Sequence, residues 1–262
     1  MNDEPLHEMK PLTRFTDRVA DYVRFRPDYP EEAIEQMLSG LGFPGLLTVA
    51  DIGAGTGILS MQIAARGALV VAVEPNEQMR GAIEQHDRIL TQDGTAEACG
   101  LKDQSINLVV CGQAFHWFDP AHALPEFRRV LKNFGRLALI WNMRDQEDPV
   151  SCGYAAALLK ASEDHPAARR SVPIETLAES DLFGGLREST FPHEQRLSIK
   201  GLIGRARSAS YCPPDGPAFD RLAQDLTELH GKHTDEHGLV SLRYRTQLFL
   251  CERTPDESLG LS

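Results

Sequence analysis

The chain has 262 residues, 42% of them hydrophobic and 25% charged, which is the composition of a globular protein with a full core. Its net charge of −11 argues against general binding to duplex nucleic acid, because phosphate contacts need a basic surface. No apolar run approaches the roughly 20 residues of a membrane span, and the acidic first residues lack the features of a signal peptide. The five cysteines are scattered without a CxxC pair, which predicts reduced thiols in a cytoplasmic protein and no thiolate zinc site.

The first 45 residues are expected to form a helical leader. Its helical pattern over 13–39 is interrupted within 26–30, where two prolines force an extended turn.

The middle of the chain, from residue 46 to residue 144, alternates short apolar runs with helical patterns, the latter clearest at 57–65 and 120–132. Five runs are expected to form strands: 46–52, 68–73, 88–91, 106–111 and 136–141. Near-continuous apolar strands separated by helices imply parallel βαβ units with both sheet faces covered. The sequence therefore predicts an α/β fold with a doubly wound sheet.

The last part of the chain, 145–262, is expected to add helices and two late strands. Helices are expected within 151–180, with breaks at Pro166 and Pro173, and over 218–230, where the pattern is amphipathic. The late strands are expected at 188–200 and 244–251. If both join the sheet, the stretch between them is an insertion at the sheet edge that forms a helical lid, and the whole chain, 1–262, is one domain.

The most informative motif follows the first expected strand. In the sequence VADIGAGTG, residues 49–57, glycines at three alternate positions allow a tight strand-to-helix turn. A ligand can then approach bare backbone and the positive end of the following helix. The spacing is G-x-G-x-G, whereas the dinucleotide-binding fingerprint requires G-x-G-x-x-G or A, so the match to that fingerprint is poor.

Three further polar segments follow the next expected strands. Glu74 ends the second strand 21 positions after Gly53, where a carboxylate can accept hydrogen bonds from a ribose diol. Residues 93–97 follow the third strand, and residues 113–119 follow the fourth. Because all these segments follow the carboxyl ends of parallel strands, they are expected to share the edge at which open α/β sheets bind ligands.

The strings VADIGAGTGILS, VVAVEPNEQM and DGTAEACGLKDQSINLVVCGQAFHWFD resemble the class I S-adenosylmethionine-dependent methyltransferases, and within them the small-molecule, type 11 branch. The likeness is specific over 46–144. Residues 21–30 also resemble the Y-x-x-x-RPxYP leader of many relatives, and residues 207–211 and 244–246 resemble parts of their C-terminal region. The resemblance implies a Rossmann-like sheet of seven mostly parallel strands whose last strand is antiparallel.

The resemblance also implies a cofactor, S-adenosyl-L-methionine, and the residues that contact it. The glycine turn would hold its aminocarboxypropyl arm, Glu74 its ribose, and later segments its adenine and its methionine part. The implied cofactor contacts are Asp51, Gly53, Ala54, Gly55, Thr56 and Gly57 in the turn, Glu74 at the ribose, Pro75, Met79, Thr95 and Ala96 near the adenine, and Gln113 and Phe115 near the sulfonium. Tyr22, Arg26 and Tyr29 could cover the cofactor from the leader, and Arg26 could pair with a carboxylate of the cofactor or of the substrate. The alternative is that these residues belong to an amphipathic surface helix.

Two residues depart from the family pattern. Thr95 stands where relatives often carry an aspartate that accepts from the adenine amino group, although a threonine hydroxyl can also accept. Asn107 stands where many relatives carry an aspartate in the fourth strand.

Methyl transfer from a sulfonium is an in-line displacement, so positioning in a dry pocket supplies much of the catalysis. A base is needed only if the acceptor starts protonated, and a carboxylate acceptor needs none. His116, after the fourth strand, is the candidate general base, and its alternative role is local hydrogen bonding beside Trp117. No N-P-P-Y or D-P-P-Y string follows the fourth strand, which disfavours amines of nucleic-acid bases and favours a small acceptor.

Other polar clusters are less specific. Arg205, Arg207 and Tyr211 are interpreted chiefly as a solvated basic face, and their alternative role is to anchor an anionic acceptor. The spacing of His230, His233 and His237 suits one helical face, but glycines interrupt that helix, and no metal site is expected.

The main hypothesis is a methyltransferase that acts on a small-molecule acceptor, by O-methylation of a carboxylate or hydroxyl. The alternatives are an NAD-linked oxidoreductase on a similar sheet and a non-catalytic module that binds S-adenosylmethionine. Neither a nucleic-acid partner nor a membrane partner is expected, and the pattern leaves the oligomeric state open.

Overall fold

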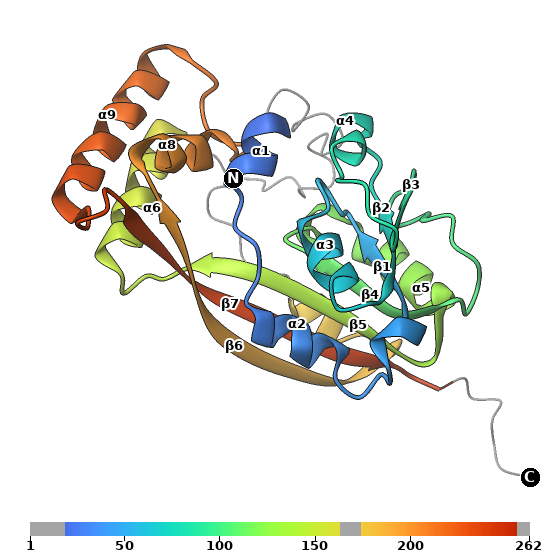
Figure 1. The fold of residues 1–262 in the computed structure, drawn as a ribbon. Coiled ribbons are helices and arrows are strands. Elements are labelled where there is room, and N and C mark those ends of the chain that lie inside the picture. Colours follow the sequence, from blue (N-terminus) through green and yellow to red (C-terminus); the bar gives the residue numbers. More distant parts are fainter. Residues whose placement is uncertain (1–18, 163–173, 256–262) are drawn as a thin grey trace, which may run out of the picture.

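The computed structural model describes residues 19–162 and 174–255. Its seven strands form one sheet in the order β3-β2-β1-β4-β5-β7-β6 (Figure 1). The strands are β1 (Thr48–Ile52), β2 (Leu69–Val73), β3 (Ile89–Gln92), β4 (Ile106–Gly112), β5 (Leu131–Arg144), β6 (Phe183–Leu197) and β7 (Val240–Arg253). The first five are parallel, while β7 is antiparallel to β5 and to β6. The predicted α/β sheet of seven strands with an antiparallel last strand is therefore confirmed.

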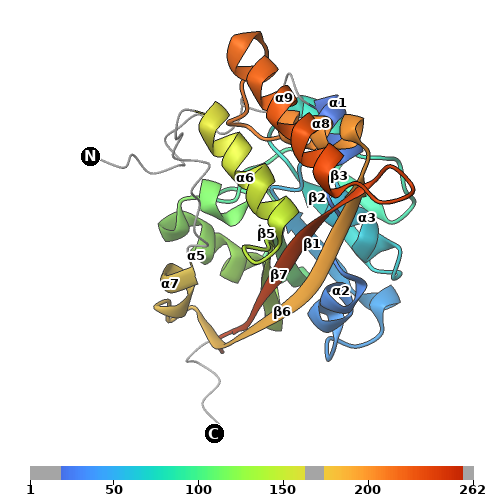
Figure 2. The ribbon, with the colours of Figure 1, turned by 90° about the vertical axis from the view of Figure 1, so that its left-hand side faces the viewer.

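Helices cover both faces of this sheet because its strands are apolar on both faces. In β1, for example, Val49 packs in one buried cluster and Ala50 and Ile52 pack in another. Figure 2 shows the helices of the two layers on opposite sides of the sheet. They are α2 (Glu31–Leu38) and α3 (Ile58–Ala64) on one face, and α5 (Pro120–Val130) and α7 (Ile174–Ala178) on the other.

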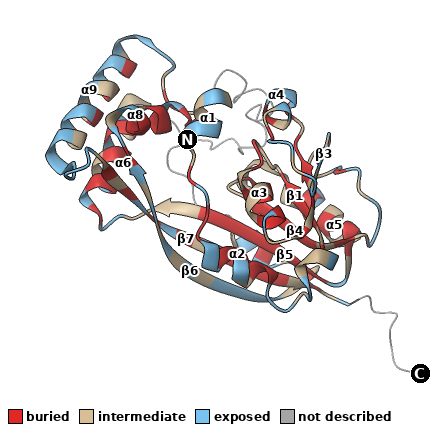
Figure 3. Cartoon of the chain, viewed as in Figure 1, coloured by how far each residue is buried: buried red, intermediate tan, exposed pale blue. Residues whose placement is uncertain are grey.

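A third buried cluster lies beyond one end of the long strands, and we call the helices that form it the lid. The lid consists of α6 (Pro149–Ala161), α8 (Ile199–Arg207) and α9 (Gly216–His233), packed against β7. The expected insertion between the two late strands is thus present as α8 and α9. The third lid helix, α6, precedes β6 in the sequence and packs with them. Figure 3 shows buried residues along the central strands and inside the lid, with exposed residues on α9.

The leader helix α1 (Val19–Phe25) packs against α8, and the extended turn at 26–30 separates it from α2, as predicted. Close contact of the two helices requires a glycine, because a Cβ on Gly204 of α8 would lie 2.2 Å from the ring of Phe25. The leader helix α1 and the lid helices therefore form one packed unit.

Several expected boundaries were wrong. The helix expected over 120–132 ends at Val130, and β5 begins at Leu131 and continues to Arg144. β6 begins at Phe183 and ends at Leu197, whereas a strand was expected at 188–200. The expected bounds differ because β6 is an edge strand, and its exposed polar residues hide its length in the sequence. Pro166 and Pro173, expected as helix breaks, lie outside the described residues. No helix among the described residues is long and apolar enough to cross a membrane.

Candidate active site

A pocket opens at the carboxyl ends of β1, β4 and β5, which is the expected edge of the sheet. Residues of the leader and of the lid complete the wall of this pocket. Its lining includes Asp51 at the end of β1, Gly53, Ala54 and Thr56 from the turn that follows, Gly112, Gln113 and Asn142 from the ends of β4 and β5, Tyr22, Arg26 and Tyr29 from the leader, and Arg205 from the lid.

The glycine turn has the left-handed backbone that its sequence predicts, with φ of +70° at Gly53, +59° at Gly55 and +80° at Gly57. A Cβ on Gly53 would lie 2.8 Å from the Cβ of Ala114, so that glycine allows close packing. A Cβ on Gly55 would make only ordinary van der Waals contacts, with Met79 at 3.7 Å and Tyr22 at 3.9 Å. Gly55 is therefore less tightly packed than Gly53, and it is partly exposed beside the residues that line the pocket.

Asp51 lies at the floor of the pocket and is almost completely buried. Its carboxylate accepts a 2.6 Å hydrogen bond from the hydroxyl of Ser60 on α3. Burial raises the pKa of Asp51 to about 7, the charge of Glu74 adds to this effect, and the Ser60 hydrogen bond opposes it. The pocket thus holds a carboxyl group that can change its charge near neutral pH.

Glu74, at the end of β2, supports the glycine turn. Its carboxylate accepts hydrogen bonds from the amide of Gly55 at 2.8 Å and from the amide of Asn76 at 2.9 Å. Burial raises the pKa of Glu74, and the two amide hydrogen bonds oppose this shift. Each carboxylate oxygen retains a second lone pair, so the group can still accept from a diol. Asn76 also caps α4 (Glu77–Gly81) by accepting from the amide of Met79, which places Met79 beside Gly55.

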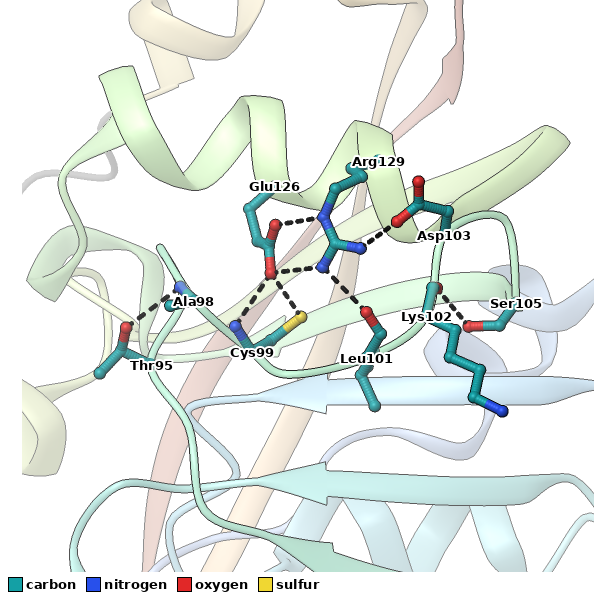
Figure 4. A network of polar contacts seen from close by, with 9 residues as sticks. All are labelled: Thr95, Ala98, Cys99, Leu101, Lys102, Asp103, Ser105, Glu126 and Arg129. Atoms are coloured by element: carbon teal, nitrogen blue, oxygen red, sulfur yellow. Dashed lines mark hydrogen bonds and ion pairs between the residues drawn. The ribbon is translucent and has the colours of Figure 1, made fainter.

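The segment after β3 is held by a polar network on α5 (Figure 4). Glu126 accepts hydrogen bonds from the amide and the thiol of Cys99, and Arg129 donates to Glu126 and to the carbonyl of Leu101. The hydroxyl of Thr95 accepts from the amide of Ala98 at 3.2 Å. This network fixes the segment that was predicted to meet an adenine.

Two predicted residues of the adenine and sulfonium regions have side chains in the core. Ala96 is 2% exposed and Phe115 is fully buried, with its ring edge-to-face on Phe118 at 6.1 Å. They shape the wall, and neither lines the pocket. Gln113 does line the pocket, with a left-handed φ of +58°, and its side chain donates to the carbonyl of Asn142 at 3.3 Å.

His116, the candidate base, lies in the short helix η4 (Phe115–Trp117) with its ring 5.0 Å from that of Trp117. It does not line the pocket. Asn107 has a structural role, because its side-chain oxygen accepts from the amide of Thr48 and from Lys132 at the other end of the sheet. Among the described residues, no group of three or more His, Cys, Asp and Glu side chains is placed to hold a metal ion.

The interpretation of Arg205 as part of a solvated face was wrong, because this residue is 6% exposed and lines the pocket, whereas Arg207 is exposed. Arg26 stacks on the ring of Tyr22 at 4.5 Å and donates to the carbonyl of Ser208 at 2.8 Å, which joins the leader to the lid. Asn142 was not anticipated, although it directly follows the apolar run of the fifth expected strand.

Comparisons with known proteins identify the family of this chain. A family model described as a methyltransferase domain matches residues 50–139. An uncharacterized methyltransferase of Mycobacterium tuberculosis is 45% identical over 136 residues, which span 50% of this chain and 53% of that relative. The match thus spans about half the length of that relative.

Longer matches extend beyond the core. An uncharacterized methyltransferase of Schizosaccharomyces pombe is 39% identical over 196 residues, or 72% of this chain and 75% of that protein. Haemonchus contortus phosphoethanolamine N-methyltransferase 2, solved with phosphomonomethylethanolamine and S-adenosylhomocysteine, has a TM-score of 0.55 and 14% identity, over 95% of this chain and 60% of that one, a likeness that shows the fold alone. These matches do not support the alternative of an NAD-linked oxidoreductase. The chain belongs to the class I S-adenosylmethionine-dependent methyltransferases.

Proposed function

We propose that this chain binds S-adenosyl-L-methionine and transfers its methyl group to an oxygen, carboxylate or hydroxyl, of a small-molecule acceptor. The observation that carries the proposal is the cradle at Gly55, where the partly exposed turn lies between Met79, Tyr22 and the carboxylate of Glu74. The cofactor would supply a methyl group already activated by its sulfonium. The residues of the chain then have to bind, orient and exclude water.

Residues in and beside the pocket divide these tasks. Glu74 can accept from the ribose diol, and Asp51 can bind the ammonium group of the aminocarboxypropyl arm through a charge-assisted hydrogen bond. Gln113 and Asn142 are held against each other and can orient polar atoms near the transferred methyl group. Tyr29, 6% exposed, packs over Gly112 and excludes water from that side.

An oxygen acceptor is favoured because the pocket needs little acid–base chemistry for it. A carboxylate attacks without prior deprotonation, whereas a hydroxyl needs one base, and His116, the candidate base, lies in η4 outside the pocket lining. We expect the enzyme to act in the cytoplasm, where its five free thiols would stay reduced.

Calorimetric titration with S-adenosylhomocysteine, with NADH as the control ligand, tests the cofactor assignment. Binding of S-adenosylhomocysteine alone is expected, and binding of NADH alone would overturn the proposal. Labelled S-adenosylmethionine with a panel of carboxylic acids and phenols then tests transfer. Cofactor binding without turnover on any acceptor would favour the non-catalytic module.

A further inference from the structure

Two arginines from distant parts of the sequence meet in the pocket wall. Arg26 follows the leader helix α1 and Arg205 lies on the lid helix α8, and both line the pocket. They share Ser208 as a partner, because Arg26 donates to its carbonyl at 2.8 Å and Arg205 to its hydroxyl at 3.3 Å. Two guanidinium groups therefore contact the same residue, Ser208.

The part of the chain that the structure describes brings no carboxylate to this pair. Among the residues that the structure describes, neither Arg26 nor Arg205 forms an ion pair, and the side chains that influence Arg205 most are Tyr154 and Tyr244. The Nε atoms of both arginines are buried, and neither has a hydrogen-bond partner among the described residues. A buried, unpaired charge is costly, so an arrangement of this kind points to a missing anion.

Tyr154, which lies beside Arg205, cannot supply that anion. Tyr154 is completely buried on α6, burial raises its pKa, and its hydroxyl has no hydrogen-bond partner among the described residues. Tyr154 is therefore neutral at pH 7 and can donate a hydrogen bond. Arg144, at the end of β5, adds a third cation 5.7 Å above its ring.

The pKa values of two neighbouring groups are shifted by the same positive charges. Burial alone would raise the pKa of Tyr211, but Arg144, Arg205 and Arg26 together hold it below its ordinary value. Burial lowers the pKa of Arg26, and repulsion from Arg205 lowers it further.

The cofactor can satisfy only part of this site. S-Adenosylmethionine carries one carboxylate beside an ammonium and a sulfonium, so it brings a net positive charge and one anionic group. Arg26, beside Tyr22 and the cradle at Gly55, is placed to take that carboxylate. Among the residues that the structure describes, Arg205 is left without a counter-ion.

We infer that the methyl acceptor is a small organic anion whose carboxylate or phosphate group binds Arg205 of the lid, with Tyr154 as a further hydrogen-bond donor. This inference rests on the proposed function, and it names the substrate class of the same pocket. Arginine suits the role because its guanidinium can form two parallel hydrogen bonds with either group.

The test compares Arg205→Gln with Lys200→Gln, which removes one exposed charge from the same helix and serves as the matched control. Each protein is titrated calorimetrically with S-adenosylhomocysteine and, with and without it, with succinate, benzoate and phenyl phosphate at constant ionic strength. Succinamide, benzamide and benzyl alcohol serve as neutral analogues. The carboxylate and phosphate arms show which group the site prefers.

We expect at least one anion, and no neutral analogue, to bind the wild type and Lys200→Gln. Arg205→Gln should lose at least tenfold in anion affinity, while its affinity for S-adenosylhomocysteine stays within about twofold. Because it removes an unpaired buried charge, Arg205→Gln should also have an unchanged or higher Tm without ligand.

Absence of anion binding to the wild type, or equal anion binding by Arg205→Gln, overturns the inference. Failure of the wild type to bind S-adenosylhomocysteine is a different result, because it contradicts the proposed function. The titrations with anions alone then still show whether Arg205 binds an anion. If Arg205→Gln does not fold, Arg205→Lys keeps the charge without the bidentate fork. It should bind the same anion more weakly than the wild type, and equal binding would overturn the inference.

Discussion

Glu74 accepts a 2.8 Å hydrogen bond from the amide of Gly55, so the acidic residue at the end of β2 supports the glycine turn that follows β1. The two residues are 19 positions apart, and parallel pairing of β1 with β2 brings them together. Glu74 has therefore a structural role in addition to the expected one at a ribose. Both roles can be separated by measuring binding and stability together.

Replacing Glu74 with alanine should weaken binding of S-adenosylhomocysteine by at least ~1 kcal/mol, or about fivefold, the scale of a hydrogen bond to a charged group. It should also lower Tm, because the amides of Gly55 and Asn76 lose their acceptor. Calorimetry and thermal denaturation measure the two effects. Unchanged affinity would contradict the ribose role even if Tm falls.

Gly53 and Gly55 should respond differently to substitution by alanine. Both have positive φ, so either change strains the backbone, but only the Cβ of Gly53→Ala would clash with a neighbour, at 2.8 Å from Ala114. Gly53→Ala should therefore lower the free energy of unfolding by about 1–3 kcal/mol. Gly55→Ala should cost less stability and should reduce cofactor affinity more. Denaturant unfolding and calorimetry check this contrast, and the opposite ranking of the two variants would show that the cradle is not at Gly55.

The core of the fold could be predicted because its parallel strands are buried on both faces and so appear as continuous apolar runs, as in β1 and β4. β6 could be predicted only in part, since an edge strand is polar on its exposed face. The role of Arg205 could not be predicted, because its burial depends on contact between the leader and the lid. No local pattern distinguishes it from the exposed Arg207, two positions later on the same helix.

The pKa of Asp51 predicts how pH affects stability and binding. Because burial raises this pKa to about 7, the folded state retains a proton that the unfolded state loses near its ordinary value of about 3.9. The contribution of Asp51 to stability should therefore fall as pH rises between these values, and stay constant above about pH 7.

A cationic ligand at Asp51 favours the ionised carboxylate, so cofactor binding should release a proton and tighten between pH 6 and pH 8, on the two sides of the pKa of about 7. Calorimetry in buffers of different ionisation enthalpy measures the released proton. Asp51→Asn should remove both the proton release and this pH dependence. If the variant keeps both, another group titrates.

Gly204 tests whether the leader must pack on the lid for the pocket to work. In Gly204→Ala the new Cβ would lie 2.2 Å from the ring of Phe25, so α1 has to move away from α8 and the hydrogen bond from Arg26 to Ser208 should be weakened. Affinity for S-adenosylhomocysteine should fall several-fold, because Tyr22 and Arg26 leave the pocket wall. Gly231→Ala on α9 is the control: nothing lies within 4 Å of its Cβ, and alanine should stabilise that helix by about 0.5–1 kcal/mol. Equal cofactor affinity in the two variants would mean that the leader does not contribute to the site.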